Sequence, residues 1–558
     1  MQVKSSRRKI LFRLLAGLVV CCGGLLVWFH LRTKLETPET GPLPKVGARE
    51  KVGPDHYRIG NNWLRKNRFG IWEMYLEGPP LERGLIYGKL ARELVNEQEE
   101  VFVAQIRNMI PSEIWLKSLK YFVGWFNRDI DQYVQPENLQ EIYGISRSFS
   151  DQFNFIGEPY YRVLNYHAAH DIGHALTDLN MVGCTSFAAN HELSADSTLM
   201  IGRNFDFNMG DRFAENKLVL FLKPEKGYAL ASVTWAGFTG VVSGMNEKGL
   251  TVTLNAAKSD IPYQAKTPIS LLAREILQYA ANISEAIAIA AKRETFVSES
   301  LLIGSAEDGK AVVIEKTPSK MDVYDSKASL TVCSNHYQGP TLSRDPANLE
   351  NIRESDSEYR FRRMRQLIDR NLPLTPGKSA SILRDQLGMD DKFLGYGNPK
   401  AINQLLAHHA VLFKPAHRKM WVSANPYQLG AFVSYDLGKV FTPVTYVTDS
   451  TGLLPADPFL VSAGYKHFES FKKTRNRITS HLMTGKPLVL SDREISDFIA
   501  ANPESYAPYE LLGAYFRQQK KYPEAAGYFR KALTKELPSE KDRKTLTRKL
   551  EDALAEVK

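Results

Sequence analysis

The hydrophobic pattern of this chain changes at Gly183-Cys184, and the change limits the folds that it can adopt. Upstream, apolar residues recur every three or four positions, which is typical of packed helices. These expected helices span residues 81–108, 112–126, 136–153 and 159–179, after a predicted strand at 69–77. Downstream, short runs rich in Val, Thr, Phe and Leu predict strands, interrupted by helices at 269–292 and 357–372. Strands grouped with helix pairs favour a layered α+β fold.

The N-terminus carries a targeting signal. Five basic residues precede an apolar run at 14–29: Lys4, Arg7, Arg8, Lys9 and Arg13. Membrane-insertion machinery reads such a pattern, and the basic side stays in the cytoplasm. We expect an uncleaved single-pass anchor, because bulky residues stand where a cleavage site needs small ones. A cleaved signal and a buried helix are the alternatives. In the first two cases the rest of the chain lies outside the cytoplasm, in the periplasm of a Gram-negative cell.

Charge and cysteine content narrow the functional classes. The 558 residues carry 72 basic and 62 acidic side chains, and the basic ones gather at both ends instead of forming one stripe with aromatics. Nucleic acid is therefore not an expected partner. The four cysteines (Cys21, Cys22, Cys184 and Cys333) are too few for a disulfide-stapled secreted domain. Either ectodomain cysteine could be a small buried apolar residue.

Cys184 stands where a nucleophile could be created by cutting the chain. An unassisted thiol is only a few per cent ionised at neutral pH, whereas a free α-amino group has a pKa near 8 and can act as its base. Cleavage at Gly183–Cys184 would supply that amine, and the glycine would minimise crowding at the carbonyl attacked. Such chemistry needs no metal and no cofactor.

Polar residues suited to such a site follow in order along the chain: Arg203, Asp206, Asn255, Asn335 and Arg360. Arg203 and Asp206 would lie on opposite faces of an ideal strand, so a bend or turn near Asn204 is expected if both serve one site. Asn255 ends a hairpin strand. Asn335 shares a strand face with Cys333 by alternation.

These motifs together resemble the cysteine N-terminal nucleophile (Ntn) hydrolases, in particular the self-cleaving penicillin acyltransferase-type branch. That branch is related to choloylglycine (bile salt) hydrolases and penicillin V acylases. The resemblance covers about residues 183–430. It is carried by Gly183-Cys-Thr, Gly202-Arg-Asn-Phe-Asp, Gly244-Met-Asn-Glu-Lys-Gly-Leu running to Asn255, Ser334-Asn335 and the Ser357-x-x-Arg-Phe helix. It implies an αββα sandwich.

The resemblance also implies roles for the residues that match. Cys184 would be the nucleophile and its freed amine the base, with Arg203 and Asp206 positioning both. Asn255, with a backbone N–H, would form the oxyanion hole. Asn335 would hold the new N-terminus and the substrate amide, and Arg360 would support the site electrostatically. The alternatives are a turn cap for each asparagine, a strand ion pair for Arg203 and Asp206, and an exposed position for Arg360.

Two departures from bile salt hydrolases matter. Their cysteine follows the initiator methionine, whereas here all of residues 1–183 precede it, which favours the self-processing branch. The spacing from Cys184 to Arg203 also differs, so bile salts are less assured as substrates.

A histidine cluster offers a competing metal site. His167, His170, Asp171 and His174 precede the cut, and the spacing of His170 and His174 would place both on one helix face, as in zinc proteases. The acid is one methylene short of the protease glutamate and no further ligand is obvious. We therefore expect a packed helix leading into the cut, with a catalytic or structural metal as the alternatives.

The predicted organisation has five parts. Residues 1–35 form the basic tail and membrane anchor, 36–61 a linker, 62–183 a mainly helical pro-region that remains as a small subunit, and 184–460 the catalytic domain. Residues 461–558 form a helical region in which 509–538 resemble one tetratricopeptide repeat. That hairpin either packs on the protein itself or offers a groove to a protein partner.

The function expected is that of a precursor which cuts itself and then cleaves a linear amide of a small N-acyl substrate through a thioester on Cys184. Hydrolysis is favoured over transfer, because water is abundant outside the cytoplasm and activated acyl donors are expected to be scarce there. Acyl transfer to another amine, or a non-catalytic scaffold using the tetratricopeptide-like end, are the alternatives.

Overall fold

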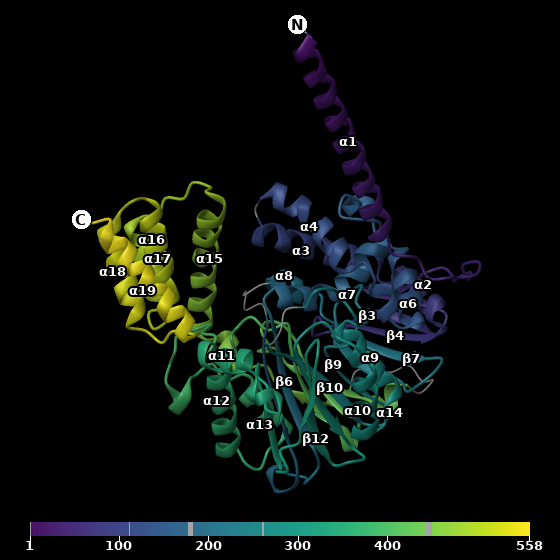
Figure 1. Ribbon diagram of the computed structural model, residues 1–558. Helices are drawn as coiled ribbons and strands as arrows, with labels where there is room; N and C mark the ends of the chain where they lie inside the picture. Colours follow the sequence, from purple (N-terminus) through teal and green to yellow (C-terminus); the bar gives the residue numbers. More distant parts are fainter. Residues whose placement is uncertain (1, 111, 177–181, 259–261, 442–448, 558) are drawn as a thin grey trace.

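The computed structural model describes residues 2–557 except 111, 177–181, 259–261 and 442–448. Within these residues the chain forms two β-sheets packed face to face, with helices outside both (Figure 1). The expectation of a mixed α and β fold is confirmed.

Over the described residues, the first sheet has eleven strands in the order β1-β2-β3-β4-β7-β8-β9-β10-β11-β12-β13. They are β1 (Glu50–Gly53), β2 (His56–Ile59), β3 (Asn62–Lys66), β4 (Trp72–Gly78), β7 (Leu218–Pro224), β8 (Leu230–Thr234), β9 (Ser243–Asn246), β10 (Leu250–Ala256), β11 (Glu299–Ser305), β12 (Lys310–Lys316) and β13 (Met321–Tyr324). The pairing of β4 with β7 is parallel. Through it, strands from before Cys184 and strands from after it share one hydrogen-bonded sheet.

The second sheet, again over the described residues, has seven strands in the order β14-β5-β6-β15-β16-β17-β18. They are β14 (Leu330–Cys333), β5 (Val182–Ala189), β6 (Met200–Phe207), β15 (His409–Lys414), β16 (Lys419–Ser423), β17 (Phe432–Asp436) and β18 (Asp449–Leu454). Cys184 lies near the start of β5, between β14 and β6. The cut proposed from the sequence therefore falls inside a strand close to the middle of the fold.

Helices that precede Cys184 cover one end of the first sheet. They are α2 (Pro80–Leu90), α3 (Arg92–Met109), α4 (Glu113–Phe126), α5 (Ile130–Tyr133), α6 (Pro136–Ser146) and α7 (Pro159–Leu176), with the 3-10 turn η1 (Asp151–Phe153). Helices α2 and α6 approach closely because glycines face the partner backbone. A Cβ at Gly84 would lie 2.1 Å from the Glu141 carbonyl oxygen, and one at Gly144 would lie 2.7 Å from that of Leu81.

A second set of helices follows Cys184 and precedes the C-terminal region. They are α8 (Asp211–Glu215), α9 (Ile269–Tyr279), α10 (Ile283–Lys292), α11 (Pro346–Glu354), α12 (Ser357–Arg370), α13 (Pro376–Leu383) and α14 (Leu437–Val440), with 3-10 turns η2 (His191–Leu193), η3 (Leu342–Arg344), η4 (Met389–Asp391), η5 (Pro415–His417) and η6 (Pro458–Val461). Local signals begin several of them. Asp345 caps α11 ahead of Pro346, and Thr375 caps α13 ahead of Pro376, as expected for a proline at the first helical position.

Three apolar cores define the layers. One lies between α9 and the outer face of the first sheet, where it includes Val252 and Ile276. A second fills the space between the sheets and includes Val313 and Val422. The third packs α12 and α13 on the outer face of the second sheet and includes Met364. The order is thus helices, sheet, sheet, helices.

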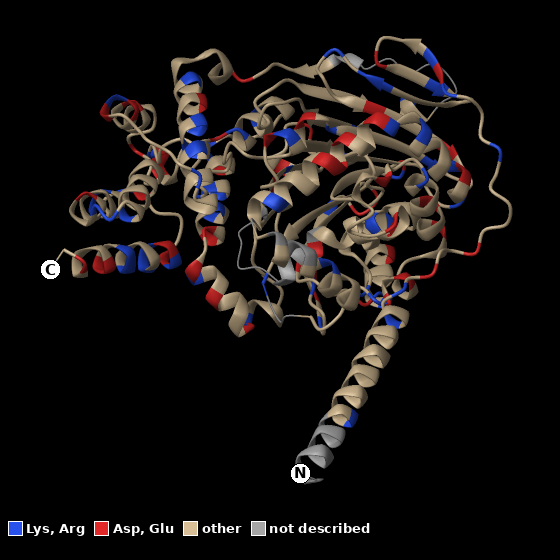
Figure 2. Cartoon of the chain, turned by 90° about the horizontal axis from the view of Figure 1, so that it is seen from above, with Lys and Arg blue, Asp and Glu red and all other residues tan. Residues whose placement is uncertain are grey.

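The N-terminal helix α1 (Gln2–Arg32) projects from the body of the protein (Figures 1 and 2). Its segment Phe12–Arg32 is long and apolar enough to cross a membrane, by length and composition alone. The inner end of α1 packs on α4, where Trp28 and Trp125 have ring centroids 5.6 Å apart, and Arg32 pairs with Asp129 at 2.6 Å. The segment expected as a linker, 36–61, contains β1 and β2, which turn at Asp55 and extend the first sheet.

The C-terminal region consists of α15 (Ala463–Thr484), α16 (Asp492–Ala501), α17 (Ala507–Gln518), α18 (Tyr522–Leu533) and α19 (Glu540–Ala555). Helices α17 and α18 meet where Gly513 faces the ring of Phe529; a Cβ there would lie 2.5 Å from the ring. This hairpin lies where the tetratricopeptide-like unit is predicted, and the assignment to that repeat stays a prediction.

Candidate active site

The pairing of β5 with β6 places the candidate residues around Cys184. Cys184 lies opposite Phe205, Ser186 opposite Arg203, and Gly183 opposite Asp206. Strand alternation therefore puts the side chains of Cys184, Ser186 and Arg203 on the face toward the first sheet. Gly183, Thr185 and Asp206 lie on the face toward α12 and α13.

The thiol of Cys184 contacts Arg203. One guanidinium nitrogen of Arg203, Nη2, donates to Sγ at 3.4 Å. The same guanidinium is held by the carbonyl oxygen of Val242 at 3.0 Å, by that of Leu254 and by Oγ of Ser243. Arg203 is fully buried, so its charge acts on the sulfur with little screening by solvent.

Burial raises the pKa of the Cys184 thiol to about 11, against the lowering effect of Arg203 and with smaller raising effects of Asp206 and Glu299. The thiol of the uncut chain is thus protonated at neutral pH. It can attack only when a base removes the proton, and Arg203 is the cation that favours the thiolate so formed.

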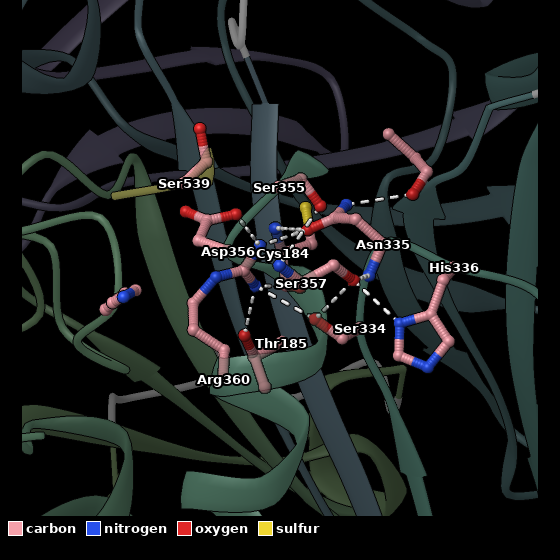
Figure 3. Close-up of polar contacts among 12 residues, drawn as sticks. Cys184, Thr185, Ser334, Asn335, His336, Ser355, Asp356, Ser357, Arg360 and Ser539 are labelled. Atoms are coloured by element: carbon pink, nitrogen blue, oxygen red, sulfur yellow. Dashed lines mark hydrogen bonds and ion pairs between the residues drawn. The ribbon is translucent and has the colours of Figure 1, made fainter. Parts of the chain in front are cut away.

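The backbone of Cys184 is held by a second group of residues (Figure 3). Its N–H donates to Oδ1 of Asn335 at 3.0 Å, and its carbonyl oxygen accepts from Nη1 of Arg360 at 2.8 Å. Arg360 also donates to Oδ1 of Asn335 at 2.7 Å and to Oγ1 of Thr185 at 2.6 Å. Arg360 is 1% exposed, so the alternative of a solvent-exposed helix residue is wrong.

Asn335 is itself fixed by two further contacts. Its Nδ2 donates to the carbonyl oxygen of Ala256 at 2.9 Å, and its backbone N–H donates to Oγ of Ser357 at 2.8 Å. The side-chain nitrogen is thus directed to Ala256, and Oδ1 faces the backbone N–H of Cys184. That oxygen is suited to accept from an amine at this position.

Asn255 lies on the thiol side of the site. Its Oδ1 accepts from Oγ of Ser186 at 3.1 Å, and its Nδ2 donates to the carbonyl oxygen of Cys333 at 3.2 Å. The fully buried side chain therefore contacts β5, the strand that carries Cys184, directly through Ser186. In this state its donor is directed to a backbone carbonyl.

Asp206 does not share a face with Arg203. Strand β6 pairs residue by residue with β5 from Met200 to Phe207, so the bend or turn expected near Asn204 is absent from this described strand. Asn204 instead donates to carbonyl oxygens of Leu383 and Ile402 on the helical side. No bend is needed, because Arg203 and Asp206 lie near the Gly183–Cys184 pair on opposite faces of the same sheet.

The carboxyl group of Asp206 is buried, and neither oxygen has a hydrogen-bond partner among the described residues. Burial raises the pKa of Asp206 to about 8, against the lowering effects of Arg360 and Arg203. The group lies beside the glycine of the candidate cut, opposite it on β6. The uncut chain therefore keeps a protonated carboxyl next to that peptide bond at neutral pH.

Several contributing residues were not predicted. Thr185 and Ser186, which follow the cysteine directly, bond to Arg360 and Asn255. Ser243 joins Arg203 to a buried histidine, since Nε2 of His409 lies 2.9 Å from its Oγ. Alternation along β5 could have indicated the first two. Ser243 and His409 come from other strands, and no sequence pattern connects them.

The histidine cluster is partly described. Nε2 of His167 accepts from the Thr239 N–H at 3.0 Å, so its Nδ1 carries the proton that Val163 O receives at 2.8 Å. Burial lowers the pKa of His167 to about 4, so it is a neutral packed residue. Asp171 accepts from the Ile269 N–H at 2.8 Å. The side chains of His170 and His174 lie outside the described residues, and no group of metal-binding side chains occurs within them.

An aromatic cavity lies next to the site. Its walls enclose about 490 Å³, part of it open to solvent, and include Phe102, Phe149, Phe207, Trp235 and Phe238. The ring of Phe207 stacks on that of Phe205, the residue opposite Cys184, with centroids 5.5 Å apart. Phe102 and Phe149 precede the candidate cut, whereas Phe207, Trp235 and Phe238 follow it. The cavity is thus formed jointly by both parts of the chain.

A buried ionic group joins the same two parts. Glu141 of α6 accepts from Arg83 of α2 at 2.5 Å and from Arg274 of α9 at 3.2 Å. All three side chains are at most 1% exposed. Separating the parts would leave charges buried without their partners or expose the core beneath them, which is costly.

The central part of the chain is similar to a known family. The family described as acyl-coenzyme A:6-aminopenicillanic acid acyl-transferase matches residues 193–426. The match begins nine residues after Cys184 and includes Arg203, Asp206, Asn255, Asn335 and Arg360.

Two curated relatives are similar to parts of the chain. An uncharacterized protein of Archaeoglobus fulgidus is 26% identical over 316 residues, which are 49% of this chain and 51% of the relative. An N-acylethanolamine-hydrolyzing acid amidase of Caenorhabditis elegans is 24% identical over 257 residues, 44% of this chain and 66% of the relative. The chain thus spans about half of the first relative and just under two thirds of the second.

Solved structures give distant likenesses. A Caenorhabditis elegans N-acylethanolamine-hydrolyzing acid amidase ortholog has a TM-score of 0.30 and 18% identity, over 42% of this chain and 93% of that one. A variant conjugated bile acid hydrolase of Clostridium perfringens has a TM-score of 0.33 and 15% identity, over 48% and 98%.

Proposed function

We propose that the protein is a self-cleaving cysteine amidohydrolase, and the match of residues 193–426 to the acyl-coenzyme A:6-aminopenicillanic acid acyl-transferase family supports this. It cuts itself at Gly183–Cys184 and then hydrolyses the carbon–nitrogen bond of a linear N-acyl amide through a thioester on Cys184. The observation that carries the proposal is the arrangement around one residue. Sγ, N and O of Cys184 each contact a different predicted residue: Arg203, Asn335 and Arg360.

The cut begins with attack of Sγ on the carbonyl carbon of Gly183. The peptide bond breaks, the nitrogen of Cys184 takes up a proton and becomes an amine, and a thioester joins Gly183 to the sulfur. Water then cleaves the thioester, which releases a carboxylate at Gly183 and the thiol. Oδ1 of Asn335 already accepts from this nitrogen at 3.0 Å, so it can hold the amine without rearranging.

Substrate turnover repeats the same bond changes. The free amine, with a pKa near 8, takes the thiol proton; Sγ attacks the amide carbonyl, the substrate amine leaves with that proton, and water releases the acid. Arg203 favours the thiolate. Asn255 supplies a donor for the oxyanion once its Nδ2 turns from the Cys333 carbonyl oxygen, which it contacts at 3.2 Å in the uncut chain.

The aromatic cavity supports an apolar or aromatic acyl group as the part of the substrate that is bound. Burying such a group gains about 25 cal/mol for each Å² removed from water. Because Phe102 and Phe149 line this cavity from before the cut, we propose that residues 62–183 remain attached as a small subunit. The resulting enzyme is an αββα Ntn hydrolase, with α1 anchoring its catalytic part outside the cytoplasm.

Intact-mass analysis of purified protein tests the cut. The wild type is expected to give two fragments separated at Gly183–Cys184, and Cys184→Ala one uncut chain. Cys333→Ala is the matched control, since that cysteine is equally buried and should not prevent cutting. A wild type that remains one chain contradicts self-processing.

A panel of N-acyl amides tests the activity, with release of the free acid as the measured product. Hydrolysis that is absent from Cys184→Ala supports the proposal. Preferential transfer of the acyl group to an added amine would instead support the acyltransferase alternative. A protein that cuts itself but turns over no amide and no acyl transfer would favour a scaffold role for the tetratricopeptide-like region.

A further inference from the structure

Gln404 packs directly on the glycine of the cut. It belongs to the loop between α13 and β15, on the helical side of the second sheet. A Cβ built on Gly183 would lie 2.9 Å from Nε2 of Gln404 and 3.4 Å from its Oε1. Exchanging the nitrogen and oxygen of the terminal amide leaves one of them at 2.9 Å, so the crowding does not depend on which way the amide is turned. A side chain at position 183 would therefore require this amide to shift.

The backbone of Gly183 would accept a side chain otherwise. Its φ is outside the left-handed region that favours glycine, and it lies within the paired strand β5. The requirement for glycine at this position comes from Gln404 and not from the chain's own conformation.

The Gln404 side chain is surrounded by packed residues. It is 6% exposed, and the loop is tied on both flanks. Asn204 donates to the Ile402 carbonyl oxygen at 2.9 Å, and the Leu405 N–H donates to Oδ1 of Asn403 at 2.9 Å. Nε2 of Gln404 is buried and has no hydrogen-bond partner among the described residues. A polar group kept in that state is costly to stability, which points to a role beside the bond that is cut.

The chemistry relates this contact to the substrate. In the cut and in turnover, the same Sγ forms a thioester with the carbonyl carbon that it attacks. The carbonyl carbon of Gly183 therefore marks the position of the substrate's acyl carbonyl carbon. It follows that the α-carbon of Gly183 marks C2 of the acyl group, the atom on which Gln404 packs.

We propose that Gln404 is a specificity-determining residue that restricts this enzyme to acyl groups with an unsubstituted CH₂ at C2. A substituent on C2 meets the Gln404 amide when it takes the direction that the side chain of an L-residue at position 183 would take. This inference rests on the proposed thioester mechanism. It adds a substrate feature that the mechanism alone does not contain, and it explains why the residue before the cut is glycine.

Self-cleavage tests the contact without any added substrate. Gly183→Ala is expected to cut about tenfold more slowly than the wild type, because a methyl group crowded by Gln404 displaces the Gly183 carbonyl from its position beside Sγ. Gly183→Ala/Gln404→Ala should recover most of that loss, since the smaller residue leaves room for the methyl group. The time course of fragment formation by intact mass measures all three rates.

Gln428→Ala is the matched control for the rescue. Gln428 is also a buried glutamine, it lies on the same side of the second sheet, and it contacts the Leu383 carbonyl oxygen, not Gly183. Gly183→Ala/Gln428→Ala should stay slow. The proposal is overturned if Gly183→Ala cuts at the wild-type rate, if Gln428→Ala rescues as well as Gln404→Ala, or if the wild type does not cut.

A matched pair of substrates tests the specificity. N-hexanoyl and N-(2-methylhexanoyl) amides of one amine are compared, with the methyl group in the enantiomer that corresponds to an L-residue. The wild type should prefer the unbranched amide by at least tenfold in kcat/KM, and Gln404→Ala should bring the ratio near one. Equal hydrolysis of both by the wild type would overturn the inference while leaving the proposed amidase standing. Absence of all amide hydrolysis would contradict the proposed amidase activity. The self-cleavage rates would still show whether Gln404 limits the size of the residue at position 183.

Discussion

Replacing Arg203 by lysine should slow self-cleavage through the pKa of the Cys184 thiol. The guanidinium uses separate nitrogens for Sγ at 3.4 Å and for the Val242 carbonyl oxygen at 3.0 Å. An ammonium group is a single point donor and cannot occupy both positions in the same geometry. The ammonium should stay with the Val242 carbonyl oxygen and Oγ of Ser243, which both contact Nη1 in the wild type, and this leaves the sulfur without its charged partner.

The size of the effect follows from one lost contact. A hydrogen bond to a charged group is worth about 1.5–3 kcal/mol, and one pKa unit corresponds to about 1.4 kcal/mol. The thiol pKa, already about 11 in the uncut chain, should therefore rise by about 1–2 units. At a fixed pH below the thiol pKa, the thiolate population and the cutting rate should fall by about 10- to 100-fold.

The assay is the rate of fragment formation between pH 6 and pH 9, measured by intact mass for both proteins. Because the thiol pKa is raised, the thiolate fraction increases about tenfold for each pH unit across this range. Wild type and Arg203→Lys should give parallel lines of log rate against pH, with the variant displaced by about 1–2 units to higher pH. A wild-type rate for the variant at pH 7, or a rate that does not rise with pH, would refute the reasoning.

Arg83→Lys provides the matched control. Arg83 is also fully buried and bonds to a backbone carbonyl, that of Gly78, and to Glu141. It makes no contact with Cys184. This substitution should lower the melting temperature but leave the pH profile of cutting where it is in the wild type.

Three further predictions concern stability, the membrane and metals. In a Cys184→Ala background, Asp206→Asn should raise the melting temperature more at pH 7.5 than at pH 4.5. The pKa of Asp206 in the folded chain is raised to about 8, so the folded chain binds a proton that the unfolded chain has lost. The stability of the chain with Asp206 therefore declines as pH rises from about 4 to 8. An equal shift at both pH values would contradict the buried, protonated carboxyl. Removing residues 1–30 should transfer the protein from the membrane fraction to the soluble fraction with cutting intact, and persistent sedimentation with membranes would count against the anchor. Dialysis against a chelator should leave both cutting and amide hydrolysis unchanged, and a loss restored by zinc would support the histidine cluster as a metal site.

The sequence predicted a set of polar residues that the structure brings together around Cys184, although it missed others that contact them. Arg203, Asn255, Asn335 and Arg360 are each brought to within one or two contacts of Cys184. These residues could be selected because each belongs to a short motif within a predicted strand or helix. Such motifs depend on neighbouring residues only, so a single sequence is enough to show them.

The prediction of a bend at Asn204 was wrong for a reason that a single strand cannot reveal. It assumed that Arg203 and Asp206 must share a face to share a site. Strand β6 is straight, and the site extends through the sheet: Arg203 reaches the thiol from one side, whereas Asp206 lies beside Gly183 on the other. Only the pairing of β5 with β6 shows that both faces meet at one peptide bond.

By itself, the sequence indicated the change from helices to strands at Cys184, the apolar N-terminal helix, and several of the polar residues around a glycine–cysteine pair. Tertiary structure alone decided the contacts of Ser243 and Gln404, and the cavity shared by both sides of the cut. The physical reason is the distance along the chain over which each kind of interaction acts. Periodicity and motif spacing report contacts within a segment, whereas the buried electrostatics of Cys184 and the space beside Gly183 depend on side chains that come together only when the two sheets and the flanking helices pack.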